Sequence, residues 1–263
     1  MYRILFKIGS VKIYSFDIML LLGFIVAGFV NCRYLVRIRC LSSDERLNNL
    51  PTVKQLATLY FYFWVWGIVG SWLTGVIWKI STDGYYRSHI DRVSDLFSVS
   101  LVSYGGIIGI FLAGFWYFRK VKLPILRSWD LVAVYLPLIR VFHRIGCFLN
   151  GCCRGKPTKA AIGVYYPTDN AVAYHPFPLY MAVFLMVIFL ILRYMRKRTY
   201  PDGFLWSVGF MLYFPGRFFI EFFRNEESIV RGIPITMAQL VCIIGSLVFL
   251  TVFLRLRKYY SKL

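Results

Sequence analysis

Seven stretches of this chain are long and apolar enough to form helices that cross a lipid bilayer. No other feature limits the possible fold as strongly, because a helix needs about 20 mostly apolar residues to cross the hydrocarbon core. The stretches comprise residues 13–35, 57–79, 97–118, 130–150, 176–194, 204–223 and 236–256. The sequence therefore predicts an all-α, polytopic membrane protein with about seven transmembrane helices.

The composition agrees with this class of protein. Hydrophobic residues make up 59% of the 263-residue chain, and charged residues make up 16%, against roughly 25% in a typical soluble protein. The net charge of +19 would suit a nucleic-acid-binding protein. However, the basic residues form short clusters between the apolar stretches, which is the pattern of loops that face anionic lipid. We therefore expect membrane lipids, and no nucleic acid, among the partners.

The basic clusters also predict an orientation. They follow the first, third, fifth and seventh stretches, whereas the loops at 83–95 and 226–231 carry mixed charge. Positive loops remain in the cytoplasm, so the N-terminus is expected outside and the C-terminus in the cytoplasm. We expect one transmembrane domain over residues 1–263. Residues 151–175, rich in glycine and proline, form an irregular extracytoplasmic segment in this prediction.

Residues 144–155 place arginine, glycine and cysteine at the end of the fourth stretch. An arginine at membrane depth is costly and indicates an anionic partner, here a lipid phosphate. Arginine suits phosphate because its planar group donates two parallel hydrogen bonds. The alternative is that Arg144, or Arg140 one turn earlier, extends towards the interface from a helix end. Gly146, Gly151 and Gly155 allow close approach of the backbone.

Three of the six cysteines, Cys147, Cys152 and Cys153, belong to the same region. They could form a disulfide, bind a soft metal, or serve as small packing residues, and packing is the default because free cysteine behaves as a small hydrophobic residue. The chain lacks the paired C-x-x-C spacing of a structural zinc site. We therefore expect no metal and no soluble cofactor.

Arg217 and Glu221 lie four residues apart in the sixth stretch. This spacing puts both side chains on one face of a helix, and an ion pair is the least costly way to keep two charges in a membrane. The pair is either a structural contact or an arrangement in which Glu221 orients Arg217 towards a phosphate. The spacing leaves both interpretations open.

Two further motifs have structural explanations. Gly105 and Gly109 in the third stretch fit the GxxxG pattern of closely packed helices, and the neighbouring Tyr104 is a candidate polar group. Thr236 and Gln239 fit a capping box at the start of the seventh stretch.

His175 stands at the entry to the fifth stretch, immediately before Pro176. Histidine is a common base near neutral pH, and it is also a common hydrogen-bonding group at the interface. Both interpretations remain open.

Taken together, these motifs resemble those of the bacterial prolipoprotein diacylglyceryl transferases, in the same order along nearly the whole chain. Residues 144–155 fit the family signature R-x-G-N-F-x-N-G-E-x-x-G, with Cys147 and Cys152 in place of its asparagine and glutamate. The other matching residues are Gly105 and Gly106; His175, Pro176, Leu179 and Tyr180; Arg217, Glu221, Phe222, Phe223 and Arg224; and Thr236, Met237 and Gln239.

The resemblance implies an activity and a location. Members of the family move a diacylglyceryl group from phosphatidylglycerol to the lipobox cysteine of a preprolipoprotein, and glycerol phosphate leaves. They are multi-pass proteins of the bacterial inner (cytoplasmic) membrane. Phosphatidylglycerol and the lipobox of a signal peptide are therefore the expected partners.

The resemblance also implies roles for individual residues. Arg144 and Arg217 would stabilise the leaving phosphate, Glu221 would hold Arg217, and His175 or Tyr104 would act as the base. The residues expected to bind substrate are Gly105, Gly106, Gly146, Cys147, Asn150, Gly151, Gly155, Tyr180 and Arg224.

Three other functions remain possible at this stage. The two cysteines in the signature favour a related lipid transferase with a different acceptor. A lipid-binding or membrane-assembly protein without catalysis would retain the same phosphate-binding residues. A small transporter is disfavoured because the sequence shows no inverted repeat of broken helices.

Overall fold

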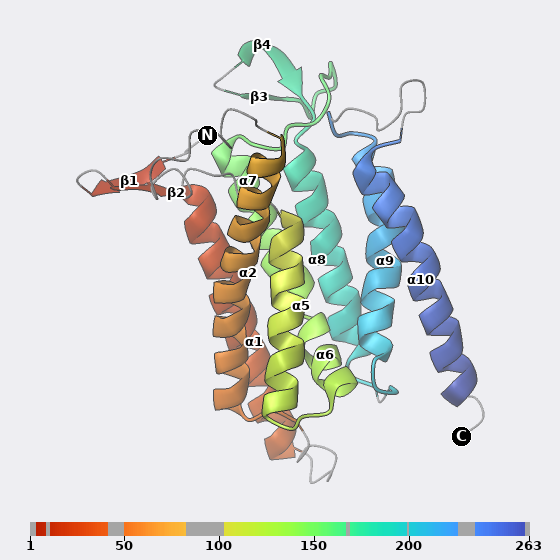
Figure 1. Cartoon of the computed structure of the whole chain (residues 1–263). Coiled ribbons are helices and arrows are strands. Elements are labelled where there is room, and N and C mark those ends of the chain that lie inside the picture. Colours follow the sequence, from red (N-terminus) through yellow and green to blue (C-terminus); the bar gives the residue numbers. More distant parts are fainter. Residues whose placement is uncertain are drawn as a thin grey trace. The chain divides into compact units, whose positions relative to one another are not determined.

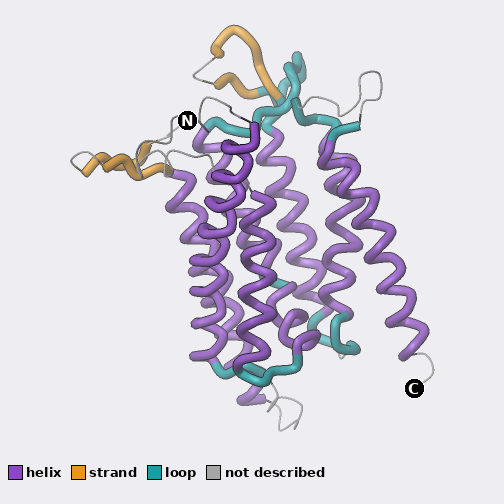
Figure 2. The backbone as a smooth tube through the Cα atoms, viewed as in Figure 1, coloured by secondary structure: helices purple, strands orange, loops and turns teal. Residues whose placement is uncertain are grey.

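The computed structural model describes residues 4–8, 11–41, 50–82, 103–166, 169–198, 200–225 and 235–260. These residues form eight helices and two pairs of short antiparallel strands (Figures 1 and 2). The helices are α1 (Ser15–Leu41), α2 (Val53–Thr82), α5 (Ser103–Lys120), α6 (Ile125–Ala133), α7 (Leu136–Asn150), α8 (Phe177–Met195), α9 (Phe204–Glu221) and α10 (Met237–Tyr260). The strands are β1 (Ile4–Ile8), β2 (Val11–Tyr14), β3 (Val164–Tyr166) and β4 (Asp169–Tyr174).

The prediction of a helical membrane protein is confirmed, because most described residues are helical and several helices are apolar. Within the described residues, four helices are long and apolar enough to cross a membrane, namely α1, α2, α8 and α10. Helices α6 and α7 add a fifth span if they are counted together, with a bend of 43° between them. Proline in the first turn of α7 suits a new helix start after this bend, because it donates no hydrogen bond. Seven spans and their orientation remain predictions.

The chain divides into two compact units, Gly28–Ser128 and Met1–Ala27 with Trp129–Leu263. In the first unit, α2 and α5 approach closely at glycines. A side chain on Gly105 would collide with the carbonyl of Gly70, and one on Gly109 would collide with the carbonyl of Trp66. The GxxxG prediction for Gly105 and Gly109 is therefore confirmed as helix packing.

In the second unit, α7 packs on α8, α8 on α9, and α9 on α10; Figure 1 shows the last pair side by side. A buried cluster between α7 and α8 contains Val141, Phe177, Met181, Ala182 and Leu185. Asp130 of α6 fixes the start of α9, because its carboxylate accepts hydrogen bonds from the N–H groups of Gly203 (2.6 Å) and Trp206 (2.8 Å).

The sequence-based interpretation of residues 151–175 as irregular is wrong in part. Strands β3 and β4 pair there, with Val164 opposite Tyr174 and Tyr165 opposite Ala173. A second hairpin, β1–β2, precedes α1. Short strands of this kind give a weak sequence signal, because each depends on backbone pairing with its partner strand and not on an apolar repeat.

Candidate functional site

Three arginine side chains from different segments converge on the ring of Phe177 in the second unit. The guanidinium carbon lies 5.8 Å from the ring centroid for Arg144 of α7, 5.3 Å for Arg217 of α9, and 5.5 Å for Arg224 after α9. Phe177 is fully buried at the start of α8. The negative face of an aromatic ring attracts cations, so Phe177 gathers the three guanidiniums around one point.

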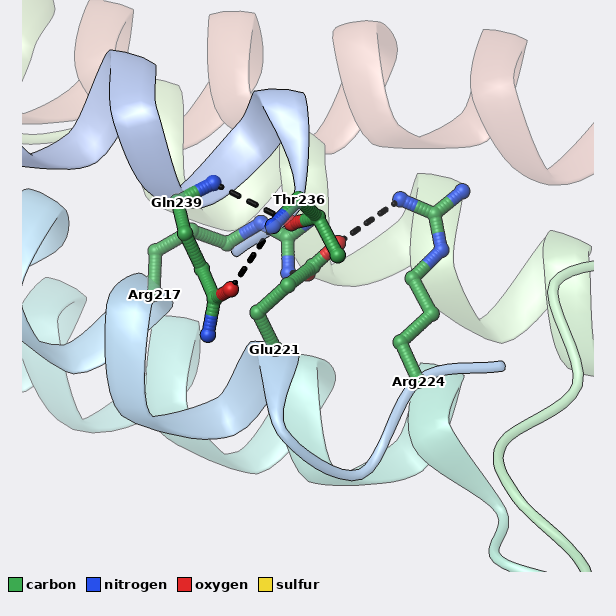
Figure 3. A network of polar contacts seen from close by, with 5 residues as sticks. All are labelled: Arg217, Glu221, Arg224, Thr236 and Gln239. Atoms are coloured by element: carbon green, nitrogen blue, oxygen red, sulfur yellow. Dashed lines mark hydrogen bonds and ion pairs between the residues drawn. The ribbon is translucent and has the colours of Figure 1, made fainter. Parts of the chain in front are cut away.

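The carboxylate of Glu221 lies among these three arginines. Glu221 is buried on α9 and forms an ion pair with Arg217 one helical turn earlier, as the sequence predicts. It also contacts Arg224, with 3.3 Å between Arg224 Nη1 and Glu221 Oε1 (Figure 3). Among the described residues around Phe177, three guanidiniums face one carboxylate, and this excess of positive charge suits an anionic ligand.

Arg144 is buried, with 6% of its surface exposed, and its Nε has no hydrogen-bond partner among the described residues. A side chain that extends towards the interface would be exposed, so this alternative is wrong for Arg144. A buried guanidinium donor without a partner is costly, because buried polar groups are normally hydrogen-bonded. The arrangement is therefore suited to an anionic ligand that accepts this hydrogen bond.

Gly155 connects three of the motifs that the sequence analysis identified. Its N–H donates to the carbonyl of His175 (3.0 Å), and the next residue, Lys156, donates to the carbonyl of Phe223 (2.8 Å). A side chain on Gly155 would lie 2.6 Å from the His175 carbonyl oxygen and 2.7 Å from that of Phe223. The end of the 144–155 segment, the His175 motif and the Arg217–Arg224 motif therefore meet at a position that requires glycine.

His175 and Tyr180 form a hydrogen-bonded pair beside this junction. His175 Nδ1 lies 2.9 Å from the hydroxyl of Tyr180, and both rings pack edge-on against Phe223. The hydroxyl of Tyr180 contacts Nδ1 and so fixes the orientation of the imidazole. It does not contact the other ring nitrogen, Nε2. The structure thus brings the two predicted site residues together against Phe223, the residue that precedes Arg224 in the chain.

Other predicted residues have structural explanations. Gly146 faces α1, where a side chain would lie 3.1 Å from Met19 Cβ and 3.2 Å from Phe16 Cα. Gly151 ends α7 in the left-handed conformation with φ of 72°, and its N–H donates to the carbonyl of Phe148. Asn150 has a buried side-chain oxygen without a hydrogen-bond partner among the described residues.

The sulfurs of Cys147, Cys152 and Cys153 all lie within 4.8 Å of one another, and all three cysteines are free thiols. Hydrogen bonds from the Cys147 and Cys152 thiols lower the pKa of Cys153. The guanidiniums of Arg144 and Arg224 lower the pKa of Cys153 further, against the opposite effect of burial. The cysteine group therefore lies within the electrostatic reach of the arginines.

Tyr166 of β3 was not predicted from the sequence. It is fully buried, its hydroxyl has no hydrogen-bond partner among the described residues, and its ring lies under the guanidinium of Arg154 at 5.6 Å. Burial raises the pKa of Tyr166 to about 12, although Arg154 acts in the opposite direction. The sequence analysis also did not identify Phe177 as a site residue. Its position between Pro176 and Pro178, at the start of a helix, was a signal that could have drawn attention to it.

The remaining predicted residues lie elsewhere. Gly105 and Gly106 belong to α5 in the other unit and pack against α2, where a side chain on Gly106 would collide with Ser71. The side chain of Tyr104 lies outside the described residues, as do the mixed-charge loops at 83–95 and 226–231. Thr236 and Gln239 exchange hydrogen bonds of 2.9 and 3.2 Å at the start of α10, which confirms the capping box (Figure 3).

Comparisons with known proteins agree with the motifs. The family model described as prolipoprotein diacylglyceryl transferase matches residues 3–255. The chain is 31% identical to the phosphatidylglycerol–prolipoprotein diacylglyceryl transferase of Clostridium tetani over 85% of each protein. It is 30% identical to the protein of that name from Thermotoga maritima, over 97% of this chain and 85% of the relative. The chain belongs to the prolipoprotein diacylglyceryl transferase family.

Proposed function

We propose that this protein transfers a diacylglyceryl group from phosphatidylglycerol to the cysteine thiol of a prolipoprotein. The observation that carries the proposal is the excess of positive charge among the described residues around Phe177, where Arg144, Arg217 and Arg224 face the carboxylate of Glu221. The phosphodiester of phosphatidylglycerol has one negative charge. The glycerol phosphate that leaves has two, so the arginines interact more strongly with the products than with the donor lipid.

The reaction exchanges one bond for another. The thiol sulfur forms a bond to the terminal glyceryl carbon of the diacylglycerol, and the bond from that carbon to the phosphate oxygen breaks. The electron pair of the broken bond stays on the phosphate, and the thiol proton passes to a base. Guanidiniums that are already held in place stabilise the charge that develops on the phosphate, without reorganising during the reaction.

We assign the roles as follows. Arg144, Arg217 and Arg224 bind the phosphate, and Glu221 positions Arg217 and Arg224. His175 takes the thiol proton and Tyr180 orients its ring, because a base must be held within hydrogen-bonding reach of the proton that it removes. The surrounding positive charge also favours the thiolate form of the acceptor, whose reference pKa is about 8.5.

The other assignments derive from the resemblance. Substrate binding by Gly105, Gly106, Gly146, Cys147, Asn150, Gly151 and Gly155, and a role of Tyr104 as the base, remain part of the proposal. We further propose seven spans in the bacterial inner membrane, with the N-terminus outside and residues 151–175 at the outer surface. The basic clusters after alternate apolar stretches support this orientation.

A transfer assay tests the proposed function. The full chain is placed in nanodiscs that contain phosphatidylglycerol and is supplied with a lipobox peptide, and the peptide mass is measured. We expect a mass gain of one diacylglyceryl group and release of glycerol phosphate. Arg144→Ala and Arg217→Ala should each lower the rate about 100-fold to 1,000-fold. Arg198→Ala is the matched control, because Arg198 is exposed beyond the end of α8.

Three other outcomes of the transfer assay would each contradict a different part of the proposal. Bound phosphatidylglycerol without turnover would show a lipid-binding protein and contradict the transferase proposal. Release of glycerol phosphate without a mass gain in the peptide would show a different acceptor, which the cysteines at two signature positions favour. Full activity of Arg144→Ala would contradict the placement of the phosphate at Phe177.

A further inference from the structure

Three thiols converge where α7 ends. Cys147 is buried in the last turn of the helix, and Cys152 and Cys153 follow the residue Gly151 that caps it. The three sulfurs lie within 4.8 Å of one another, and the Cys152 thiol also lies 3.4 Å from the carbonyl oxygen of Cys147. The proposed transfer chemistry assigns no proton transfer and no phosphate contact to these thiols, so the convergence of all three requires a separate explanation.

The backbone is bent to bring the third sulfur into this group. Gly151 adopts φ of 72°, and Cys153 adopts φ of 58°, which is a left-handed conformation that residues with a side chain rarely take. Left-handed non-glycine residues concentrate at functional sites, where the surrounding structure stabilises them. Packing alone would not require this conformation, because a small side chain can fill space from a relaxed backbone.

The spacing of the sulfurs suits one thiophilic metal ion. Zinc binds thiolates at about 2.3 Å, so sulfurs around a tetrahedral ion lie about 3.8 Å apart. Three sulfurs that already lie within 4.8 Å of one another reach this geometry through small side-chain movements. A fourth metal ligand could come from His143, whose Nδ1 lies 3.9 Å from the Cys147 sulfur.

The charges nearby agree with a metal–thiolate centre. A bare divalent cation would be repelled by Arg144 and Arg224, which both act electrostatically on Cys153. Three thiolates and one divalent ion carry a net charge of −1 (−3 + 2 = −1), which the arginines attract. Metal binding therefore favours the thiolate forms of the cysteines and converts a repulsive contact into an attractive one.

We propose that Cys147, Cys152 and Cys153 form a binding site for one thiophilic metal ion, with three thiolate ligands and a fourth, lighter donor. This proposal departs from the sequence-based expectation that the cysteines are packing residues and that the protein binds no metal. It does not depend on the transferase activity.

Zinc binding to the purified, tag-free full chain in detergent tests the proposal. The protein is reduced with a phosphine, treated with a chelator, and titrated with Zn²⁺ against a colorimetric competitor. We expect one zinc per chain, and X-ray absorption should show three sulfur neighbours at about 2.3 Å with one nitrogen or oxygen neighbour. Cys147→Ser, Cys152→Ser and Cys153→Ser should each weaken binding by more than about 100-fold.

The other three cysteines provide the matched control. A triple variant with Cys32→Ser, Cys40→Ser and Cys242→Ser keeps the three thiols at the end of α7, and it should bind zinc as the parent protein does. Co²⁺ added to the parent protein gives a second measurement that needs no variant, because thiolate-to-cobalt charge-transfer bands grow with the number of thiolate ligands. A stoichiometry near zero would overturn the proposal, and so would unchanged affinity in Cys152→Ser. A disulfide between any two of the three cysteines in protein purified without reductant would also overturn it.

Discussion

Arg217 and Glu221 form a buried ion pair across one turn of α9, and the same carboxylate also contacts Arg224. Glu221 therefore holds two of the three guanidiniums that surround Phe177, while the third, Arg144, reaches the ring from α7. This arrangement restrains the arginines without neutralising them. The ion pair is thus a structural contact of the folded chain, and the role of Glu221 in orienting Arg217 towards a phosphate remains a proposal.

Glu221→Gln should destabilise the protein and make its stability depend on anionic lipid. The substitution removes the carboxylate charge that pairs with the buried Arg217 and with Arg224, and breaking a buried pair costs about 3 kcal/mol or more. We expect a lower midpoint of thermal unfolding in neutral detergent. Added phosphatidylglycerol should raise that midpoint more in the variant than in the parent protein. An unchanged midpoint would mean that the pair contributes nothing to stability.

Phe177→Leu should reduce transfer by about tenfold or more, because each cation–ring contact at a buried site stabilises by about 1 to 2 kcal/mol. Phe189→Leu is the matched control, since Phe189 is also buried on α8 but contacts Tyr135 and the guanidinium of Arg193 in place of the three site arginines. Both variants should lose similar stability, and only Phe177→Leu should lose activity. Equal activity losses would assign Phe177 a packing role alone. Rates at saturating and limiting phosphatidylglycerol, with thermal unfolding, provide the comparison.

Gly155→Ala should destabilise the junction between the three motifs. The new Cβ would press against two carbonyl oxygens at 2.6 and 2.7 Å, and backbone atoms cannot move away cheaply. Overpacking of this kind costs about 1 to 3 kcal/mol. Gly209→Ala on α9 is the control, because a Cβ there meets only the flexible end of Leu192 at 3.3 Å. If both variants unfold like the parent protein, the close approach at Gly155 is unimportant.

Thr236→Ala should cost about 1 kcal/mol through loss of the N-cap of α10. Thr236→Ser keeps the hydroxyl that accepts the hydrogen bond from Gln239 N–H, so it should retain most of the stability. Thr251→Ala, on the exposed side of the same helix, is expected to be close to neutral. Chemical or thermal unfolding of the three variants checks this order, and a Thr236→Ser variant as unstable as Thr236→Ala would contradict it.

Ionisation of the buried Tyr166 hydroxyl should lower the free energy of unfolding at high pH. Its folded-state pKa of about 12 lies above the ordinary value of 10.0, so the folded state holds the phenol proton more tightly than the unfolded state. The resulting stabilisation is complete below pH 10 and is lost as the pH rises towards about 12. The stability of Tyr166→Phe, which lacks this proton, should fall less over that interval. Tyr165→Phe, an exposed neighbour, should follow the parent protein.

Short-range sequence patterns predicted much of this molecule because helical periodicity determines local contacts. The ion pair of Arg217 with Glu221 and the cap of Thr236 with Gln239 each join residues three or four apart on one helix. The GxxxG pattern at Gly105 and Gly109 likewise predicts packing, since two glycines on one face allow a neighbouring helix to approach.

Contacts between distant segments could not be predicted in this way. Nothing in the local pattern indicates that Gly155 pairs with His175, or that Arg144 and Arg224 meet at Phe177. The strands β3 and β4 also depend on pairing between segments, which no local pattern specifies. For the same reason the convergence of the three cysteine sulfurs becomes visible only when the chain turns at Gly151 and Cys153.

By itself the sequence determined that the chain is a helical membrane protein, and it predicted which arginines and which carboxylate form the candidate phosphate site. Apolar length and helical spacing are local properties, and they follow directly from the order of residues. Only the tertiary structure decided that three guanidiniums share one buried aromatic ring and that Glu221 serves two of them. These contacts depend on how α7, α8 and α9 pack, and packing is settled by the fit of many side chains at once.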